Sequence, residues 1–161
     1  MVSNVMTFAF EGVEARRVDV QVQFAGGQPA FIIVGLPDKA VSEARERVRA
    51  ALSAIGLGLP PKRIIVNLAP ADLPKDGGHF DLPIALALLM ELGATPRDAA
   101  DRFAVIGELG LDATLAPVAG ALPARGCTAP ACISSSRSST PARSSPRRRW
   151  PCRTTQRQRA S

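Results

Sequence analysis

Apolar and polar residues alternate between Val18 and Phe24, and this pattern predicts a strand with one buried face. Other short apolar or β-branched runs, bounded by turn residues, predict strands at residues 7–11, 31–34, 64–68 and 103–108. A turn at residues 110–113 follows the last of these runs and leads toward a sixth strand near Leu115.

Two segments have the pattern of helices. Asp38 can cap the first helix, which has one apolar face and ends at Gly56. The residues of that face are Val41, Ala44, Val48, Leu52 and Ile55. Residues 82–92 are apolar on nearly every side, which predicts a second helix buried in the core.

The charges of the first helix indicate a solvated face. Its arginines, Arg45, Arg47 and Arg49, are interleaved with Glu43 and Glu46, and such mixing is not typical of a nucleic-acid interface. Glu43 lies one helical turn before Arg47, so we expect these two side chains to pair.

The predicted elements follow one another as three strands, a helix, a strand, a helix and two strands. This order indicates the α/β (α+β) class, with a two-layer mixed sheet covered by helices. A further helix is expected after Val118, but only residues 119–124 keep a helical composition.

Residues 72–80 are predicted to form an exposed loop between the fourth strand and the second helix. Gly77 and Gly78 can adopt the positive φ angles of a sharp turn. Three roles stay open for this loop: a structural turn, a contact with a partner or subunit, or a phosphate cradle that includes Lys75 and Asp76. No G-x-x-x-x-G-K-[ST] motif occurs in the chain, so we expect no ATP binding by it.

Four motifs occur in order: F-I-I-V-G-L-P-D at residues 31–38, S-E-A-R-E-R-V-R-A-A-L at 42–52, P-K-R-I-I-V-N-L-A-P-A-D-L-P-K at 61–75 and V-I-G-E-L-G-L-D at 105–112. On these motifs, the chain resembles the Lon-protease-like domain of the magnesium-chelatase-like AAA+ ATPases of the YifB/ComM competence family. The resemblance runs from Phe8 to about Ala124. It implies an accessory or assembly module, with ATP and Mg expected only for an ATPase domain that would follow.

Lon-type peptidases use a Ser-Lys dyad, because a hydroxyl needs a nearby base to become nucleophilic. Alignment on the shared P-K-D-G run places His79 where the serine belongs, and Leu122 falls where the lysine belongs. We therefore assign no catalytic, cofactor-binding or metal-binding residue. A catalytic pair of His79 and Asp81 with another serine is a weaker alternative.

Composition divides the chain after residue 124. Residues 1–124 hold 11 basic and all 14 acidic side chains, whereas residues 125–161 hold nine arginines and no acid. We expect one domain at 1–124 and a disordered Arg/Ser/Pro-rich tail at 125–161, because the tail has too few large apolar residues for a core. The tail is interpreted as a frameshifted product or as a basic arm. We also expect an uncovered apolar surface near Val105 and Val118.

Three cysteines, Cys127, Cys132 and Cys152, form neither a disulfide framework nor a paired metal motif, so no metal site is expected. No run is long enough to span a bilayer, and no secretory signal is visible, which favours the cytoplasm. Self-association, as in hexameric AAA+ relatives, is one expected partnership, and no small-molecule substrate is expected. Three functions are open: a non-catalytic module of a DNA-processing ATPase, nucleic-acid binding through the tail, or a Lon-type peptidase.

Overall fold

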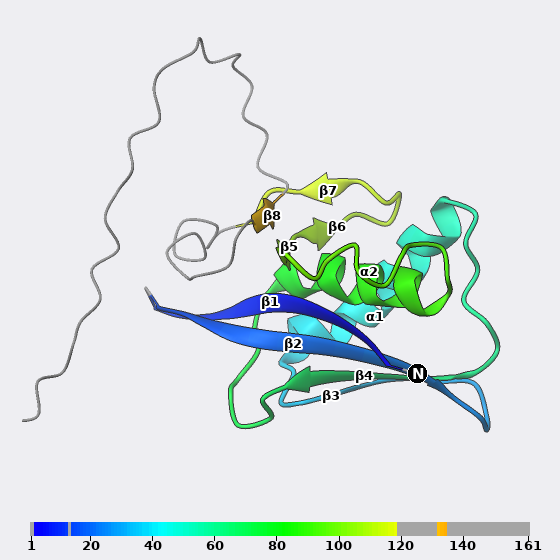
Figure 1. Cartoon of the computed structure of the whole chain (residues 1–161), viewed down its shortest axis with the longest axis horizontal. Helices are drawn as coiled ribbons and strands as arrows, with labels where there is room; N and C mark the ends of the chain where they lie inside the picture. The colour runs from blue at the N-terminus through cyan, green and yellow to red at the C-terminus, as the bar shows by residue number, and fades with distance from the viewer. Residues whose placement is uncertain (1, 13, 119–131, 135–161) are drawn as a thin grey trace, which may run out of the picture.

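The computed structural model describes residues 2–12, 14–118 and 132–134. A mixed six-stranded sheet, in the order β3-β4-β2-β1-β5-β8, carries two helices that pack against one face (Figure 1). The strands of this sheet are β1 (Ser3–Glu11), β2 (Glu14–Ala25), β3 (Ala30–Val34), β4 (Arg63–Ala69), β5 (Ala104–Ile106) and β8 (Cys132–Ser134). The helices are α1 (Lys39–Ala54) and α2 (Asp81–Glu91). The predicted two-layer class is therefore confirmed.

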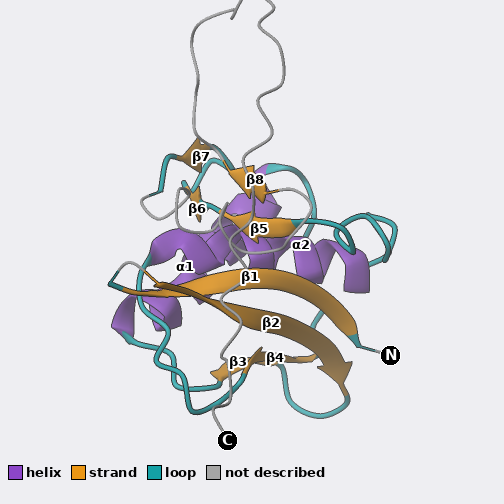
Figure 2. Ribbon diagram, turned by 60° about the vertical axis from the view of Figure 1, so that its left-hand side comes forward, coloured by secondary structure: helices purple, strands orange, loops and turns teal. Residues whose placement is uncertain are grey.

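Two crossovers explain why the sheet is mixed. β1, β2 and β4 pair antiparallel, whereas β3 pairs parallel with β4 and β5 pairs parallel with β1. A parallel pair needs a long connection, and the helices provide it: α1 joins β3 to β4, and α2 lies between β4 and β5. Figure 2 shows β1 to β4 stacked below both helices.

The core lies between the sheet and the helices. Val18, Val20 and Val22 are fully buried there, as their alternation predicts, and α1 contributes Val41, Ala44, Val48 and Leu52. Ile55 is the exception. It is the C-terminal cap of α1 and is 53% exposed, so its assignment to the buried face is wrong. The helix ends one residue too early for Ile55 to reach the core.

The strand predicted at residues 103–108 is interrupted at Gly107. β5 ends at Ile106, and Glu108–Leu109 forms β6, which pairs with β7 (Leu115–Ala116) in a separate two-stranded sheet. The Gly107 backbone is used elsewhere: its N–H donates to the His79 carbonyl, and its carbonyl accepts from the Leu82 N–H. A β-carbon on Gly107 would lie 2.8 Å from Leu82 Cδ2, so a larger residue there would displace the Leu82 side chain.

One expectation about the C-terminal part needs correction. Val105 is only 1% exposed, so the predicted uncovered surface is absent there, and Val118 is partly buried against Phe8 and its neighbours. The three residues of β8 pair parallel with β5. Residues 119–131 and 135–161, which include Leu122 and most of the arginines, lie outside the described residues, and their predicted disorder stays a prediction.

We expect Gly35→Ala to destabilise the fold strongly. Gly35 has a φ of 105°, and an added β-carbon would lie 2.1 Å from the Leu68 carbonyl oxygen in β4. The unfavourable backbone conformation and the forced shift of β4 together cost about 2–4 kcal/mol. Urea unfolding of this variant and of Gly26→Ala provides the comparison, because Gly26 has free space and no positive φ. Equal losses in the two variants would contradict the role of Gly35.

Candidate functional site

Two loops meet at the carboxyl ends of β3 and β4. Residues 35–38 follow β3, and Lys75 in the loop after β4 bonds to them through its backbone. The Asp38 N–H donates to the Lys75 carbonyl at 2.9 Å, and the Lys75 N–H donates to the Leu36 carbonyl at 3.3 Å. The Asp38 carboxylate accepts from the Val41 N–H at 2.7 Å, which confirms the predicted helix cap.

The loop at residues 72–80 is only partly exposed, so the prediction of an exposed loop is wrong for Lys75, His79 and Phe80. Lys75 and Phe80 are fully buried and His79 is 7% exposed. The Lys75 ammonium donates to the Pro70 carbonyl within the same loop. Burial lowers the pKa of Lys75, and the nearby charge of Asp72 opposes this shift.

His79 fixes the loop to β1. Its Nε2 lies 2.9 Å from the Phe8 carbonyl oxygen, and because a carbonyl can only accept, Nε2 is the protonated nitrogen. The imidazole packs against Phe10 and Phe80 at ring-centroid distances of 5.0 and 4.3 Å. Burial lowers the pKa of His79, and the bond to Phe8 partly offsets this, so the neutral ring is favoured.

Asp81 begins α2 and pairs with Arg47 of α1. Arg47 Nε lies 2.6 Å from Asp81 Oδ2, and Arg47 Nη2 lies 3.0 Å from Oδ1, so the pair is bidentate. The Asp81 carboxylate also accepts from the Leu109 N–H at 3.2 Å. Burial raises the pKa of Asp81, while Arg47 and Leu109 offset part of that rise; the bond to Asp81 in turn raises the pKa of Arg47. Lys39, not Arg47, lies against Glu43, so the predicted Glu43–Arg47 pair is wrong.

The turn at Gly77 and Gly78 is closely packed against neighbouring residues. Gly77 has a φ of 92°, as predicted, whereas Gly78 has no positive φ and lies close to Glu108: a β-carbon there would lie 2.8 Å from the Glu108 carboxyl carbon. An acidic side chain at this distance would repel a phosphate group. The structure therefore favours the structural turn over the phosphate cradle.

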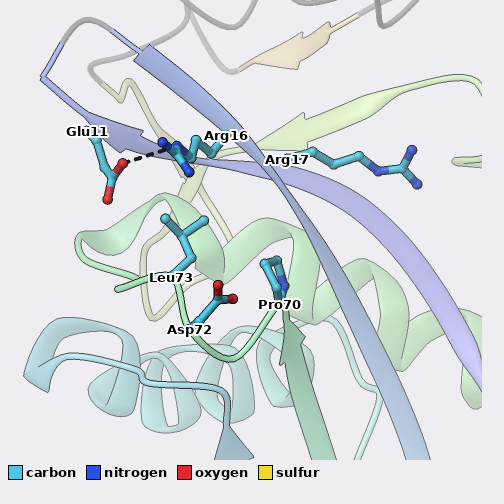
Figure 3. Close-up of a pocket in the computed structure, with 6 residues that line it drawn as sticks. All are labelled: Glu11, Arg16, Arg17, Pro70, Asp72 and Leu73. Carbon is cyan, nitrogen blue, oxygen red and sulfur yellow. Dashed lines mark ion pairs between the residues drawn. The ribbon is translucent and has the colours of Figure 1, made fainter.

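An open cavity of about 440 Å³ lies beside the loop, between the β1–β2 hairpin and the segment after β4 (Figure 3). Its lining residues are Glu11, Arg16, Arg17, Pro70, Asp72 and Leu73. Arg16 is paired with Glu11 at 3.2 Å, and Arg17 points away from the cavity toward Asp19. The lining charges are of mixed sign, and both arginines already have acidic partners, so they do not converge on a ligand.

Within residues 2–12, 14–118 and 132–134, no three His, Cys, Asp or Glu side chains gather as metal ligands. In the same part of the chain, no helix is long and apolar enough to cross a bilayer.

The sequence singles out His79 but does not predict the buried pair between Arg47 and Asp81 beside it. Arg47 was assigned to a solvated face, although its guanidinium is turned toward Asp81. Asp81 was considered only as a partner of His79. One signal could have found the pair: an acidic residue directly before an apolar helix needs a cation once that helix is buried.

These features define a two-layer α+β domain whose central loop is closed by internal bonds. The family described as subunit ChlI of Mg-chelatase matches residues 20–131. Competence protein ComM of Haemophilus influenzae is 47% identical over 113 residues, which are 70% of this chain and 22% of that protein. The uncharacterized protein YifB of Escherichia coli is 46% identical over 120 residues, covering 74% of this chain and 24% of that protein.

The chain belongs to this magnesium-chelatase-like family, together with ComM and YifB. A more distant relative, an uncharacterized protein of Mycobacterium tuberculosis, is 38% identical over 116 residues, 72% of this chain and 23% of that protein. The chain spans less than a quarter of the length of these curated relatives.

We expect Asp81→Asn to lower the free energy of unfolding by about 3 kcal/mol, because one partner of a buried ion pair is lost. Asp19→Asn is the matched control. It removes the same charge from the Arg17–Asp19 pair, whose arginine is 63% exposed, and should cost less than about 1 kcal/mol. Chemical unfolding measures both variants. Similar losses would show that the Arg47–Asp81 pair has no special role.

The second expectation concerns pH. His79 is the chain's single histidine, and its pKa in the folded protein lies below the ordinary value of 6.5. Between these two pKa values the unfolded chain binds more protons, so stability is complete above about pH 6.5 and falls as the pH decreases through that window. His79→Gln keeps a donor for Phe8 but does not titrate there.

Urea midpoints between pH 7.5 and 5 should therefore fall more steeply for the wild type than for His79→Gln. Asp81 has a raised pKa and acts in the opposite direction, but it is present in both proteins and cancels in the comparison. Parallel curves for the two proteins would contradict a buried, neutral His79.

Proposed function

We propose that this chain is a non-catalytic module of a magnesium-chelatase-like AAA+ ATPase of the YifB/ComM type, which acts in DNA processing during natural transformation. Family membership and the printed name of the competence protein ComM support the biological setting. The chain itself contributes a rigid domain for assembly or for holding a partner, and ATP and Mg belong to a separate ATPase domain.

The environment of His79 carries this proposal. In the Lon-type alignment, its position belongs to the nucleophile, which has to face the substrate and a base. His79 instead points into the protein, bonds to the Phe8 carbonyl and packs between two phenylalanines. A substrate could reach this ring only by breaking those contacts.

The neighbouring ionisable groups are also used internally. The Lys75 ammonium is bound to the Pro70 carbonyl, and the Asp81 carboxylate to Arg47 and Leu109. His79 and Asp81 therefore face different partners, which argues against a His-Asp catalytic pair. Most of residues 125–161 lie outside the part of the chain that the structure describes. Nucleic-acid binding through them therefore stays a prediction from the sequence.

We expect no peptidase activity and no saturable ATP binding. Casein digestion followed by mass spectrometry, and calorimetric titration with Mg-ATP at micromolar protein, test both points on the full chain. Cleavage that persists in His79→Ala would contradict the Lon-type alignment, and cleavage lost in that variant would identify a histidine-based site. Saturable ATP binding would show that the chain has a nucleotide site of its own.

A further inference from the structure

Strand β3 forms one edge of the main sheet. Among the described residues it pairs only with β4, so the outward-facing N–H and C=O groups of Ala30–Val34 have no strand beside them. Edge strands are usually protected by lysine, proline or a bulge, and the sequence Ala-Phe-Ile-Ile-Val contains none of these. This edge can therefore accept another strand.

The open face of the sheet is apolar along the same edge. Ile32 lies opposite Ile65 of β4 in the register, and both are half-buried. Val34 is 41% exposed and Leu36, just beyond the strand, is 59% exposed. Leu36 also has a φ of 55°, an unfavourable conformation for leucine, so an apolar side chain is displayed at some conformational cost.

The helix side of the edge is basic and grooved. Ser42, Arg45, Arg49 and Ser53 follow one another at helical spacing along α1. Ser42 and Arg45 share a cavity of about 250 Å³ with Phe31, Ile32 and Ile33 of β3. Arg49 and Ser53 line a second cavity of about 420 Å³ that reaches Ala30.

One of these arginines is free to take a partner. The nearby acids are occupied, since Glu46 lies 3.0 Å from Arg45 Nε and Glu43 lies 3.8 Å from Lys39. The exposed Arg49 side chain makes no ion pair or hydrogen bond with any other described residue. A ligand along this edge therefore meets a net positive charge on the helix side.

We infer that the β3 edge binds an extended acidic peptide segment of a partner protein, which adds a strand to the sheet. The peptide backbone pairs with β3, its apolar side chains extend the Ile32–Val34 strip, and its acidic side chains face Arg45 and Arg49. The inference rests on the proposed non-catalytic role, because the peptide is held and not cleaved.

Two other occupants fit less well. A second copy paired through β3 would bring Arg45 and Arg49 of both copies into one interface, where like charges repel. A nucleic acid offers phosphates to the arginines, but it supplies few donors for the β3 carbonyls and places charge against an apolar strip.

The test uses the full chain and a fluorescent nine-residue peptide in which valine alternates with glutamate. The control peptide has lysine in place of each glutamate. Fluorescence anisotropy should show tighter binding of the glutamate peptide. Val34→Lys, which protects the edge, and Arg49→Glu should each weaken that binding by about fivefold or more. Arg102→Glu is the matched control, since Arg102 is exposed and makes no ion pair or hydrogen bond with another described residue. Its affinity should stay within about twofold of wild type.

The nine arginines of residues 125–161 could bind an acidic peptide by themselves, and Val34→Lys separates the two modes. Binding through those arginines is unchanged or strengthened by an added lysine, whereas binding at the β3 edge is weakened. Hydrogen exchange gives an independent readout, because strand addition should protect amides within Ala30–Val34. Unfolding midpoints near that of the wild type confirm that the variants fold.

Several results would overturn the inference. The first is a Val34→Lys variant that binds the peptide as tightly as the wild type. The second is an equal loss of peptide affinity in Arg49→Glu and Arg102→Glu. The third is that the peptide gives the β3 amides no new protection from hydrogen exchange. Dimers in sedimentation velocity that Val34→Lys abolishes would assign the edge to a second copy. Single-stranded DNA that binds without protecting β3, but is weakened by Arg49→Glu, would assign it to nucleic acid. A cleaved peptide would refute the non-catalytic role, whereas failure to bind would refute only the peptide site.

Discussion

The ion pair between Arg47 and Asp81 is the constraint on which the rest of the site depends. The Asp81 side chain is completely buried, and a carboxylate in that position is tolerated only when its oxygens are bonded. Arg47 of α1 and the Leu109 amide of β6 supply those bonds. The start of α2 is thereby fixed against α1 and the small sheet of β6 and β7, which restricts the conformation of the loop before it.

In this conformation, most polar groups of the loop are bonded within the protein. Its backbone bonds to Leu36, Asp38 and Gly107, and its basic side chains are bound to the Pro70 and Phe8 carbonyls. Few of these groups remain to meet a substrate. His79 instead joins this loop to β1 through the Phe8 carbonyl. The edge strand β3 differs, because its outer backbone groups and Arg49 have no described partner.

The C-terminal end of β3 combines a packing constraint with the proposed binding edge. Gly35, directly after the strand, packs against Leu68 of β4, while its neighbours Val34 and Leu36 are exposed. An incoming peptide strand would be placed on a rigid element, which limits the conformational entropy lost on binding.

Local sequence determined most of the elements. The alternation at Val18–Val22, the Asp38 cap and the apolar run of α2 are short-range signals, and each gave an element of the correct type. The motif resemblance also gave the family correctly. What the sequence could not determine is where distant segments meet. Arg47 and Asp81 are 34 residues apart and His79 and Phe8 are 71 apart, so their pairing follows only once the sheet order is set. The same reason explains the errors at the partly buried loop and at Gly107: burial and strand pairing depend on neighbours in space that no local pattern encodes.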